Sequence, residues 1–482
     1  MVSDGKNGHL AVLRDVRTAS MTSWWARLLV RLRAGPFARA VATLAGATAV
    51  AQAISLAASP LLTRLYTPDD FGIASVFMSF LSLAVGVSAL RYDLAIPLPE
   101  DDAVARGLLT ISLSCVLATT LALAVVVAGF GYGIVEWFNA PGLGPFLWLL
   151  PAGLLVAGIH QVLSSWAVRE RAYGLLARRR VIQNLGAAAT QVGIGVLGGG
   201  PIGLLIGEVV RQGAGTASLA ALAWRGTQRG ERRSWLADTI RAARVYYRYP
   251  TLVTGSSILN AGGLFLPPVL LAKTYGTEVA GLFALAQRMV EAPVRLLGQS
   301  VGQVYFAEAA AVARGGSARL PGMYFSTAKK LFVVGSVPVL VAGMASPWLF
   351  GAIFGATWRE AGTVAQALSW FTAVRFVAYP LSQTLNILGR QDLQAGWDVF
   401  RLMAALGTIL VGAQAGLSAV NTIRLFALGL SISYLVLFLL GAREVSRLRA
   451  PKPAGGAEPG GSSSVPHTGP CDGRHSEEGN GR

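Results

Sequence analysis

Cysteine and histidine are nearly absent from this chain of 482 residues, which has two cysteines and four histidines. Cys115 and Cys471 cannot build a disulfide framework or a cysteine-based metal site. Three of the histidines lie close to the ends, and only His160 falls within the hydrophobic part of the chain. A histidine-rich metal site is therefore excluded, and we expect no metal and no other cofactor.

Charged residues are also scarce. They make up 13% of the chain, about half of the usual globular share, whereas hydrophobic residues make up 53%. A chain with so little charge cannot cover a water-facing surface, so we expect an integral membrane protein with many spans. The net charge of +17 would suggest a nucleic-acid partner for a soluble protein. We expect no such partner here, because the cytoplasmic loops of membrane proteins are basic anyway.

Neither end of the chain contains a membrane-spanning run. Residues 1–39 are polar to amphipathic, and residues 24–33 interleave tryptophan and leucine with arginine, which suits a short cytoplasmic helix on a membrane surface. A signal peptide is the alternative, but no small-residue cleavage site follows a short apolar core. Residues 443–482 become rich in glycine, proline and serine from about residue 451, and we expect a disordered cytoplasmic tail.

Between these ends the sequence predicts an all-α bundle of twelve transmembrane helices. Each apolar run is long enough to cross a hydrocarbon core of about 30 Å. The runs are 40–63, 71–90, 104–130, 146–168, 177–198, 201–224, 249–272, 279–305, 328–350, 360–385, 393–413 and 417–440.

The distribution of lysine and arginine gives the orientation of this bundle. With the N-terminus in the cytoplasm, the cytoplasmic segments hold 32 of these residues and the opposite loops hold only three. This strong positive-inside signal predicts an even number of spans in a bacterial cytoplasmic membrane, with both termini in the cytoplasm. It also explains the net charge without nucleic acid.

A short internal repeat divides the spans into two halves. Residues 60–73 read PLLTRLYTPDDFGI, and residues 268–282 read PVLLAKTYGTEVAGL. Both have a proline, then a basic residue, Tyr, and a glycine followed by an aliphatic residue, and they lie six spans apart. A parallel duplication would place them so, and two six-span halves are a transporter architecture. We expect an N-terminal lobe at 40–225, a cytoplasmic linker at 226–248 and a C-terminal lobe at 249–442.

The loops leave little room for catalysis. The outer loops are short and almost uncharged, which argues against a membrane polysaccharide polymerase or ligase. No G-x-x-x-x-G-K-[ST] motif occurs. Residues 193–198 match G-x-G-x-x-G, but they lie in an apolar span, where small residues serve helix packing. We therefore expect a transporter and not an enzyme.

Six arginines lie inside the predicted spans and carry the clearest functional signal. Each would cost about 2.5–3.5 kcal/mol against lipid, so they must face a bundle interior or a watery cavity. Two of them have an acid three residues away on the same helix, Arg211 with Glu208 and Arg401 with Asp398, and these pairs favour a structural role.

One face of the eighth span combines charge and hydrogen-bonding groups. Arg288, Glu291, Arg295 and Gln299 recur at helical spacing, and the tenth span repeats the pattern around Arg375 and Tyr379. A polar stripe that joins two helices is the alternative. Surplus positive charge instead favours a hydrophilic cavity for an anionic, hydroxyl-rich substrate, because arginine binds phosphate bidentately. The candidate substrate-binding residues are Gln52, Arg211, Arg288, Glu291, Arg295, Gln299, Arg375, Tyr379 and Arg424.

Several segments resemble one family. Residues 62–72 read LTRLYTPDDFG and residues 91–102 read RYDLAIPLPEDD. Residues 281–288 read GLFALAQR and residues 386–391 read NILGRQ. These segments are similar to bacterial polysaccharide flippases of the Wzx type, whose superfamily also holds lipid II flippases and multidrug extruders. The resemblance covers nearly all of residues 40–442, and Arg288 lies where that family usually has arginine.

The resemblance implies two six-helix lobes around a central cavity. It also implies outward translocation of a polyprenyl-diphosphate-linked oligosaccharide by alternating access, for surface polysaccharide such as capsule, O-antigen or exopolysaccharide. Expected partners are this lipid-linked oligosaccharide, the bilayer and other polysaccharide assembly proteins. The alternative is an ion-coupled exporter of another amphiphile, a drug extruder or a lipid II flippase. A drug extruder would favour acids in the lumen, and lipid II flippases usually have two further spans.

Overall fold

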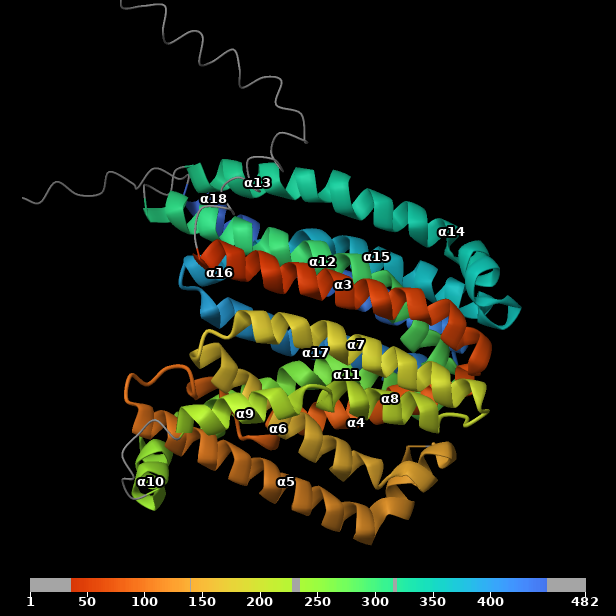
Figure 1. Ribbon diagram of the computed structural model, residues 1–482. Coiled ribbons are helices and arrows are strands. Elements are labelled where there is room, and N and C mark those ends of the chain that lie inside the picture. The colour runs from red at the N-terminus through yellow and green to blue at the C-terminus, as the bar shows by residue number, and fades with distance from the viewer. Residues whose placement is uncertain (1–35, 139, 228–234, 315–318, 449–482) are drawn as a thin grey trace, which may run out of the picture.

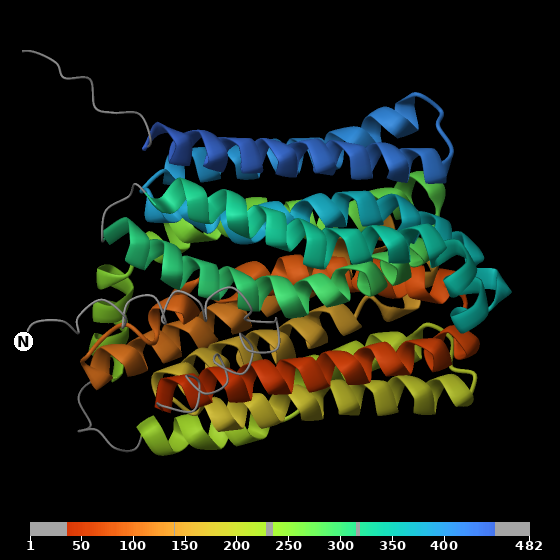
Figure 2. The ribbon, with the colours of Figure 1, turned by 90° about the horizontal axis from the view of Figure 1, so that it is seen from above.

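The computed structural model describes residues 36–138, 140–227, 235–314 and 319–448, and within these ranges it contains helices and no strand. The predicted N-terminal surface helix at residues 24–33 and the C-terminal tail beyond residue 448 lie outside the described residues. The long helices run side by side in two perpendicular views (Figures 1 and 2).

The helices of the first half precede the linker. They are α3 (Pro36–Leu65), α4 (Pro68–Ser88), α5 (Asp102–Trp137), α6 (Leu149–Arg169), α7 (Tyr173–Val196), α8 (Ile202–Gly213) and α9 (Thr216–Thr227), with the short turns η1 (Tyr92–Ala95) and η2 (Pro141–Phe146) between them. The linker contains α10 (Trp235–Val245), which packs against α5 (Figure 1).

Helices of the second half follow the linker. They are α11 (Thr254–Tyr275, preceded by the π-helical turn η3, Tyr249–Val253), α12 (Thr277–Arg314), α13 (Leu320–Leu331), α14 (Val337–Phe354), α15 (Arg359–Leu381), α16 (Gln383–Ile387), α17 (Gln391–Gln414) and α18 (Ala419–Arg447). A π-helical turn, η5 (Phe332–Ser336), joins α13 to α14, and η6 (Ala356–Trp358) precedes α15.

All twelve predicted spans are helical in the structure, so the protein is an all-α membrane protein with two lobes of six helices. The sixth span consists of α8 and α9, and the ninth of α13, η5 and α14. Within the described residues, seven helical stretches are long and apolar enough to cross a membrane by composition alone. The remaining spans include α12 and α15, which carry the predicted charged stripes.

The repeated segments occupy equivalent places in the two halves. The hydroxyl of Tyr66, at the end of the first span, donates a hydrogen bond to the carbonyl of Gln191 on the fifth span, 2.5 Å away. The hydroxyl of Tyr275, at the end of the seventh span, donates to the carbonyl of Leu417, between α17 and α18, at 3.0 Å. The same anchoring tyrosine thus supports the parallel repeat, and we propose that the lobes follow the predicted ranges 40–225 and 249–442.

The repeated glycines bring the two halves together. Gly72 on α4 and Gly281 on α12 lie at the crossing of these helices, where a Cβ on Gly72 would stand 1.8 Å from the carbonyl oxygen of Thr277. A Cβ on Gly281 would stand 1.8 Å from the carbonyl oxygen of Pro68. Only glycine permits two backbones to approach this closely in a membrane bundle.

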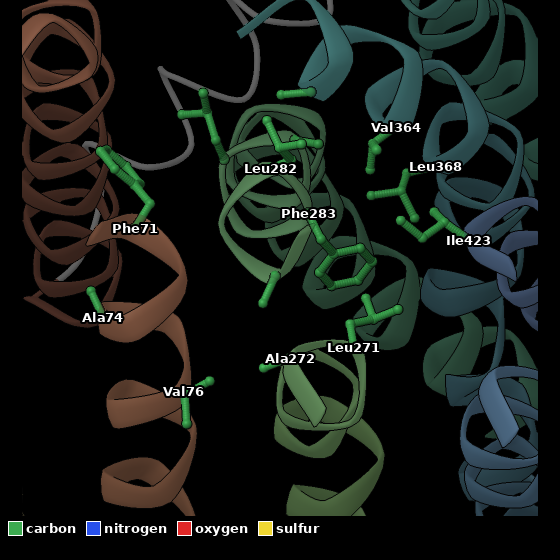
Figure 3. Close-up of a cluster of buried hydrophobic side chains, with 14 of the residues drawn as sticks. Phe71, Ala74, Val76, Leu271, Ala272, Leu282, Phe283, Val364, Leu368 and Ile423 are labelled. Atoms are coloured by element: carbon green, nitrogen blue, oxygen red, sulfur yellow. The ribbon is translucent and has the colours of Figure 1, made fainter. Parts of the chain in front are cut away.

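Aromatic and aliphatic side chains surround this crossing. The indole Nε1 of Trp358 donates to the carbonyl of Thr63 at 2.9 Å, and its ring meets Phe71 edge-on at 5.0 Å. Figure 3 shows Val76 of α4 pointing toward Ala272 of α11 in the second half. The two halves are therefore in close contact at the end of the bundle that the predicted topology places outside.

The glycine crossing leads to a prediction about stability. Gly72→Ala forces α4 away from α12, and we expect the free energy of unfolding to fall by about 1–3 kcal/mol, as for other overpacked positions. Thermal unfolding of the detergent-solubilised protein measures the change. Gly129→Ala is the matched control, because a Cβ there meets nothing within 4 Å. Equal stability of the two variants would contradict the close approach.

Candidate functional site

A guanidinium of the second half reaches the first half at Arg288. Nη2 of Arg288, on α12, donates to the carbonyl oxygen of Ser55 on α3 at 2.9 Å and also reaches the Ser55 hydroxyl. The hydroxyl of Ser59, one turn along α3, donates to the same carbonyl at 2.9 Å. Gln52 lies half-buried one turn before Ser55 on the same helix. These polar residues of α3 therefore meet the polar stripe of α12 between the lobes.

The predicted stripes of α12 and α15 are joined by an ion pair. Nη1 of Arg375 lies 2.9 Å from Oε1 of Glu291, and the two side chains are only 16% and 15% exposed. The side-chain amide of Gln287 donates to the same carboxylate oxygen at 3.2 Å. Arg375 has no acid within a turn of its own helix, so its partner comes from a neighbouring helix, 84 residues earlier in the chain.

Glu291 and Arg375 line a small cavity inside the second half. Five helices contribute to its wall, α11, α12, α15, α17 and α18. Its polar lining residues are Gln287, Glu291, Thr372, Arg375, Arg401 and Tyr434. The cavity has a volume of about 30 Å³, which is room for one or two water molecules and far too little for an oligosaccharide.

Four polar residues of the cavity are not among the sequence candidates, and they include Arg401 and Tyr434 beside Gln287 and Thr372. Arg401 donates to Oδ1 of Asn260 on α11 at 2.7 Å and lies 3.5 Å from the Asp398 carboxylate. Its spacing from Asp398 predicted a local structural pair, and that pair exists, but the guanidinium also reaches a second helix. Arg401 could have been found from its charge alone, whereas nothing in the sequence distinguishes Tyr434 from other tyrosines.

One further predicted residue lies close to this cavity, and two lie apart from it. Tyr379 is 45% exposed, and its ring centroid lies 6.0 Å from Cζ of Arg375. Arg211 forms a bidentate pair with Glu208 on α8, with Nε 2.7 Å from Oε2. Arg424 is exposed near the start of α18, where it donates to Oδ1 of Asn421 at 3.2 Å. The structure therefore does not bring Arg211 or Arg424 into the cavity of the second half.

The remaining predicted residues, Arg295 and Gln299, belong to α12, but their side chains lie outside the described residues. Helical spacing alone puts Arg295 and Gln299 on the same face of α12 as Arg288 and Glu291.

The family and sequence comparisons place these features among known proteins. A family model described as "Polysaccharide biosynthesis protein" matches residues 61–363. The teichuronic acid biosynthesis protein TuaB of Bacillus subtilis (strain 168) is 24% identical over 178 residues, 37% of this chain and 36% of that protein. The lipopolysaccharide biosynthesis protein WzxC of Escherichia coli (strain K12) is 27% identical over 170 residues, 35% of this chain and 34% of that protein. The chain thus matches about a third of the length of these curated relatives.

Solved structures share the fold. The lipid II flippase MurJ in an inward closed conformation superposes with a TM-score of 0.65 at 12% identity, covering 84% of this chain and 89% of that one. An inward-facing multidrug resistance transporter of the MATE family superposes with a TM-score of 0.57 at 15% identity, covering 86% of this chain and 96% of that one. At these identities the likeness concerns the arrangement of helices alone.

The ion pair between Arg375 and Glu291 leads to a prediction. Arg375→Gln leaves a carboxylate buried without its partner, so we expect the free energy of unfolding to fall by about 3–5 kcal/mol. The double variant Arg375→Gln, Glu291→Gln removes both charges and should recover most of that loss.

Denaturation of the purified protein in detergent measures both variants, and Arg424→Gln is the control because Arg424 is exposed. If Arg375→Gln were no less stable than Arg424→Gln, the ion pair would not contribute to the free energy of unfolding.

Proposed function

The chain belongs to the polysaccharide biosynthesis protein family, and from this premise we propose that it is a membrane flippase for surface polysaccharide precursors. Its substrate is a polyprenyl-diphosphate-linked oligosaccharide, which it moves from the cytoplasmic to the outer leaflet of the bacterial cytoplasmic membrane. The observation that carries this proposal is the contact of Arg288 with Ser55, which places a cationic group between two lobes of a twelve-helix membrane bundle.

The chemistry of Arg288 suits the diphosphate of such a substrate. Two of the groups to which this guanidinium donates, the carbonyl and the hydroxyl of Ser55, are neutral acceptors. Phosphate oxygens are charged, match the planar guanidinium fork and form hydrogen bonds about twice as strong as neutral ones. A diphosphate that enters between α3 and α12 can therefore replace Ser55 as the acceptor, and it would loosen the contact between the lobes as it binds.

Alternating access follows from the same arrangement. The lobes are in close contact around Gly72 and Gly281, so release of substrate on the outer side requires α4 and α12 to separate there. The small cavity beside Arg375 is too confined for sugars in this conformation. We propose that the rocking of one lobe against the other opens a larger space lined by the polar faces of α3, α12 and α15, including Gln52, Glu291 and Tyr379.

A second candidate function is the export of another amphiphile, since the fold is shared with a multidrug transporter and a lipid II flippase. The family model favours the polysaccharide precursor. Catalysis is not proposed, because the relatives' names describe biosynthesis proteins and the structural neighbours are transporters and flippases. Other polysaccharide assembly proteins are proposed partners in the membrane.

Removal of Arg288 tests this function in cells. In a strain without the chromosomal copy, Arg288→Ala should abolish surface polysaccharide at unchanged protein level, because the diphosphate loses its guanidinium. Immunoblotting and staining of the extracted polymer measure the two quantities.

Two control variants make the test specific. Arg424→Ala removes an exposed arginine, and Ser55→Ala removes the hydroxyl acceptor but keeps the carbonyl, so both should support nearly normal polymer. Normal polymer from Arg288→Ala at normal protein level would refute the role of Arg288. A loss in Ser55→Ala as large as in Arg288→Ala would show that the helix contact matters, and not the binding of phosphate.

A further inference from the structure

His160 on α6 and Arg179 on α7 form a polar contact inside the first lobe. His160 is the one histidine among the described residues. The sequence places His160 in the hydrophobic part of the chain and Arg179 at the start of the fifth predicted span. The structure buries Arg179, which is only 3% exposed.

The guanidinium of Arg179 depends on neutral acceptors. Its Nη2 lies 3.0 Å from Nε2 of His160 and also contacts Nδ1, while Nη1 lies 3.5 Å from the hydroxyl of Ser164. Its Nε has no partner, and none of the ion pairs formed within the described part of the chain includes Arg179. A buried charge without a carboxylate is costly unless hydrogen bonds satisfy it, so the imidazole is its principal acceptor.

The contact with Arg179 favours a neutral His160. A guanidinium has only N–H donors, so the ring nitrogen that faces it must carry a lone pair, and the imidazole must be neutral. Nη2 of Arg179 contacts both ring nitrogens, and whichever of them carries the proton has a hydroxyl within reach, Thr216 on α9 at 3.4 Å from Nδ1 or Ser164 at 3.3 Å from Nε2. The amide of Gln183 on α7 is 3.5 Å from Nε2.

Protonation of His160 is incompatible with the present position of Arg179. An imidazolium has no acceptor, so the hydrogen bond would be lost and two cations would stand about 3 Å apart. The surrounding charges give little relief. Arg211 on α8 is a second positive charge that opposes a charged ring, and Glu208 is already bound to Arg211 in a bidentate pair. The buried carboxylate of Asp93 in η1 reaches α6 at the neighbouring Gln161, 2.8 Å away.

We propose that His160 is a proton-binding site whose occupancy is tied to the conformation of α6 and α7. The ring is neutral while Arg179 is in place, and it takes up a proton when Arg179 has moved away. Because a proton then binds one conformation and not the other, acid favours the conformation in which this contact is broken. Together with the proposed transport function, on which this step rests, His160 couples a proton gradient to the movement of the lobes.

A chain of contacts connects this site to the other lobe. Arg180, next to Arg179 on α7, donates to the hydroxyl of Thr48 on α3. Helix α3 packs along α7 and carries Ser55, the acceptor for Arg288 of the second lobe. A displacement of α7 that follows the loss of the Arg179 contact therefore bears on the contact of Arg288 with Ser55 between α3 and α12.

Spin labels at exposed positions test the proton site without any substrate. Glu136→Cys on α5 and Thr357→Cys in η6 report the distance between the lobes in the full-length protein, with Cys115 and Cys471 replaced by serine and the protein held in phosphatidylethanolamine–phosphatidylglycerol nanodiscs. We expect the distance distribution to change between about pH 8 and about pH 5, the range in which histidine titrates. His160→Gln still accepts from Arg179 but cannot be protonated, so it should lose the change.

Arg179→Gln removes the charge that opposes protonation and should also lose the change, whereas His467→Gln, outside the described residues, should retain it. An unresponsive parent protein, or a response that survives in His160→Gln, would overturn the proton site.

A separate arm measures the translocation of a lipid-linked oligosaccharide in vesicles with an imposed pH gradient, which should stimulate the parent protein but not His160→Gln. If the spin labels respond while the parent protein moves no oligosaccharide, the proposed substrate is wrong and the proton site stands.

Discussion

The burial of guanidinium groups at membrane depth is the constraint on which the arrangement of this bundle depends. An arginine costs about 2.5–3.5 kcal/mol in a lipid-facing helix, so each buried one needs acceptors from its surroundings. In the second lobe these acceptors come from other helices. Arg288 joins α12 to α3, Arg375 joins α15 to α12, and Arg401 joins α17 to α11. The charges that our proposal assigns to an anionic substrate therefore also join particular helices to one another.

The two lobes use these charges differently, although they share a repeat. Tyr66 and Tyr275 anchor equivalent helices, and Gly72 and Gly281 meet where the lobes cross. Beyond this shared frame, Arg375 and Glu291 of the second lobe pair across two helices beside a small cavity, whereas Arg179 of the first lobe contacts the ring of His160. In our proposal, the interface between the lobes binds the diphosphate and the first lobe binds the proton.

The sequence predicts the helices well because membrane spans are recognisable by their length and hydrophobicity. The arginines of the loops also indicate the orientation of the chain in the membrane. It also predicts the repeat, since Tyr and Gly recur at matching places. The site is only partly predictable, because the partner of a buried charge lies on another helix. Spacing along α15 could not reveal Glu291 as the partner of Arg375, nor could it separate Arg424, exposed near a helix end, from the buried arginines. Arg179 lies at the start of the fifth predicted span, and because helix ends are the least certain part of any span, the sequence could not show that its side chain is buried.

The central claim is that the lobes move a lipid diphosphate past Arg288. Its most direct measurement is the translocation of a fluorescent polyprenyl-diphosphate-linked oligosaccharide by the purified protein in vesicles, followed by a lectin added outside. The account predicts that the protein exposes the sugar to the lectin, that Arg288→Ala does not, and that an uncharged polyprenyl glycoside is not moved. Equal exposure of the charged and uncharged lipids, or full activity of Arg288→Ala, would contradict it.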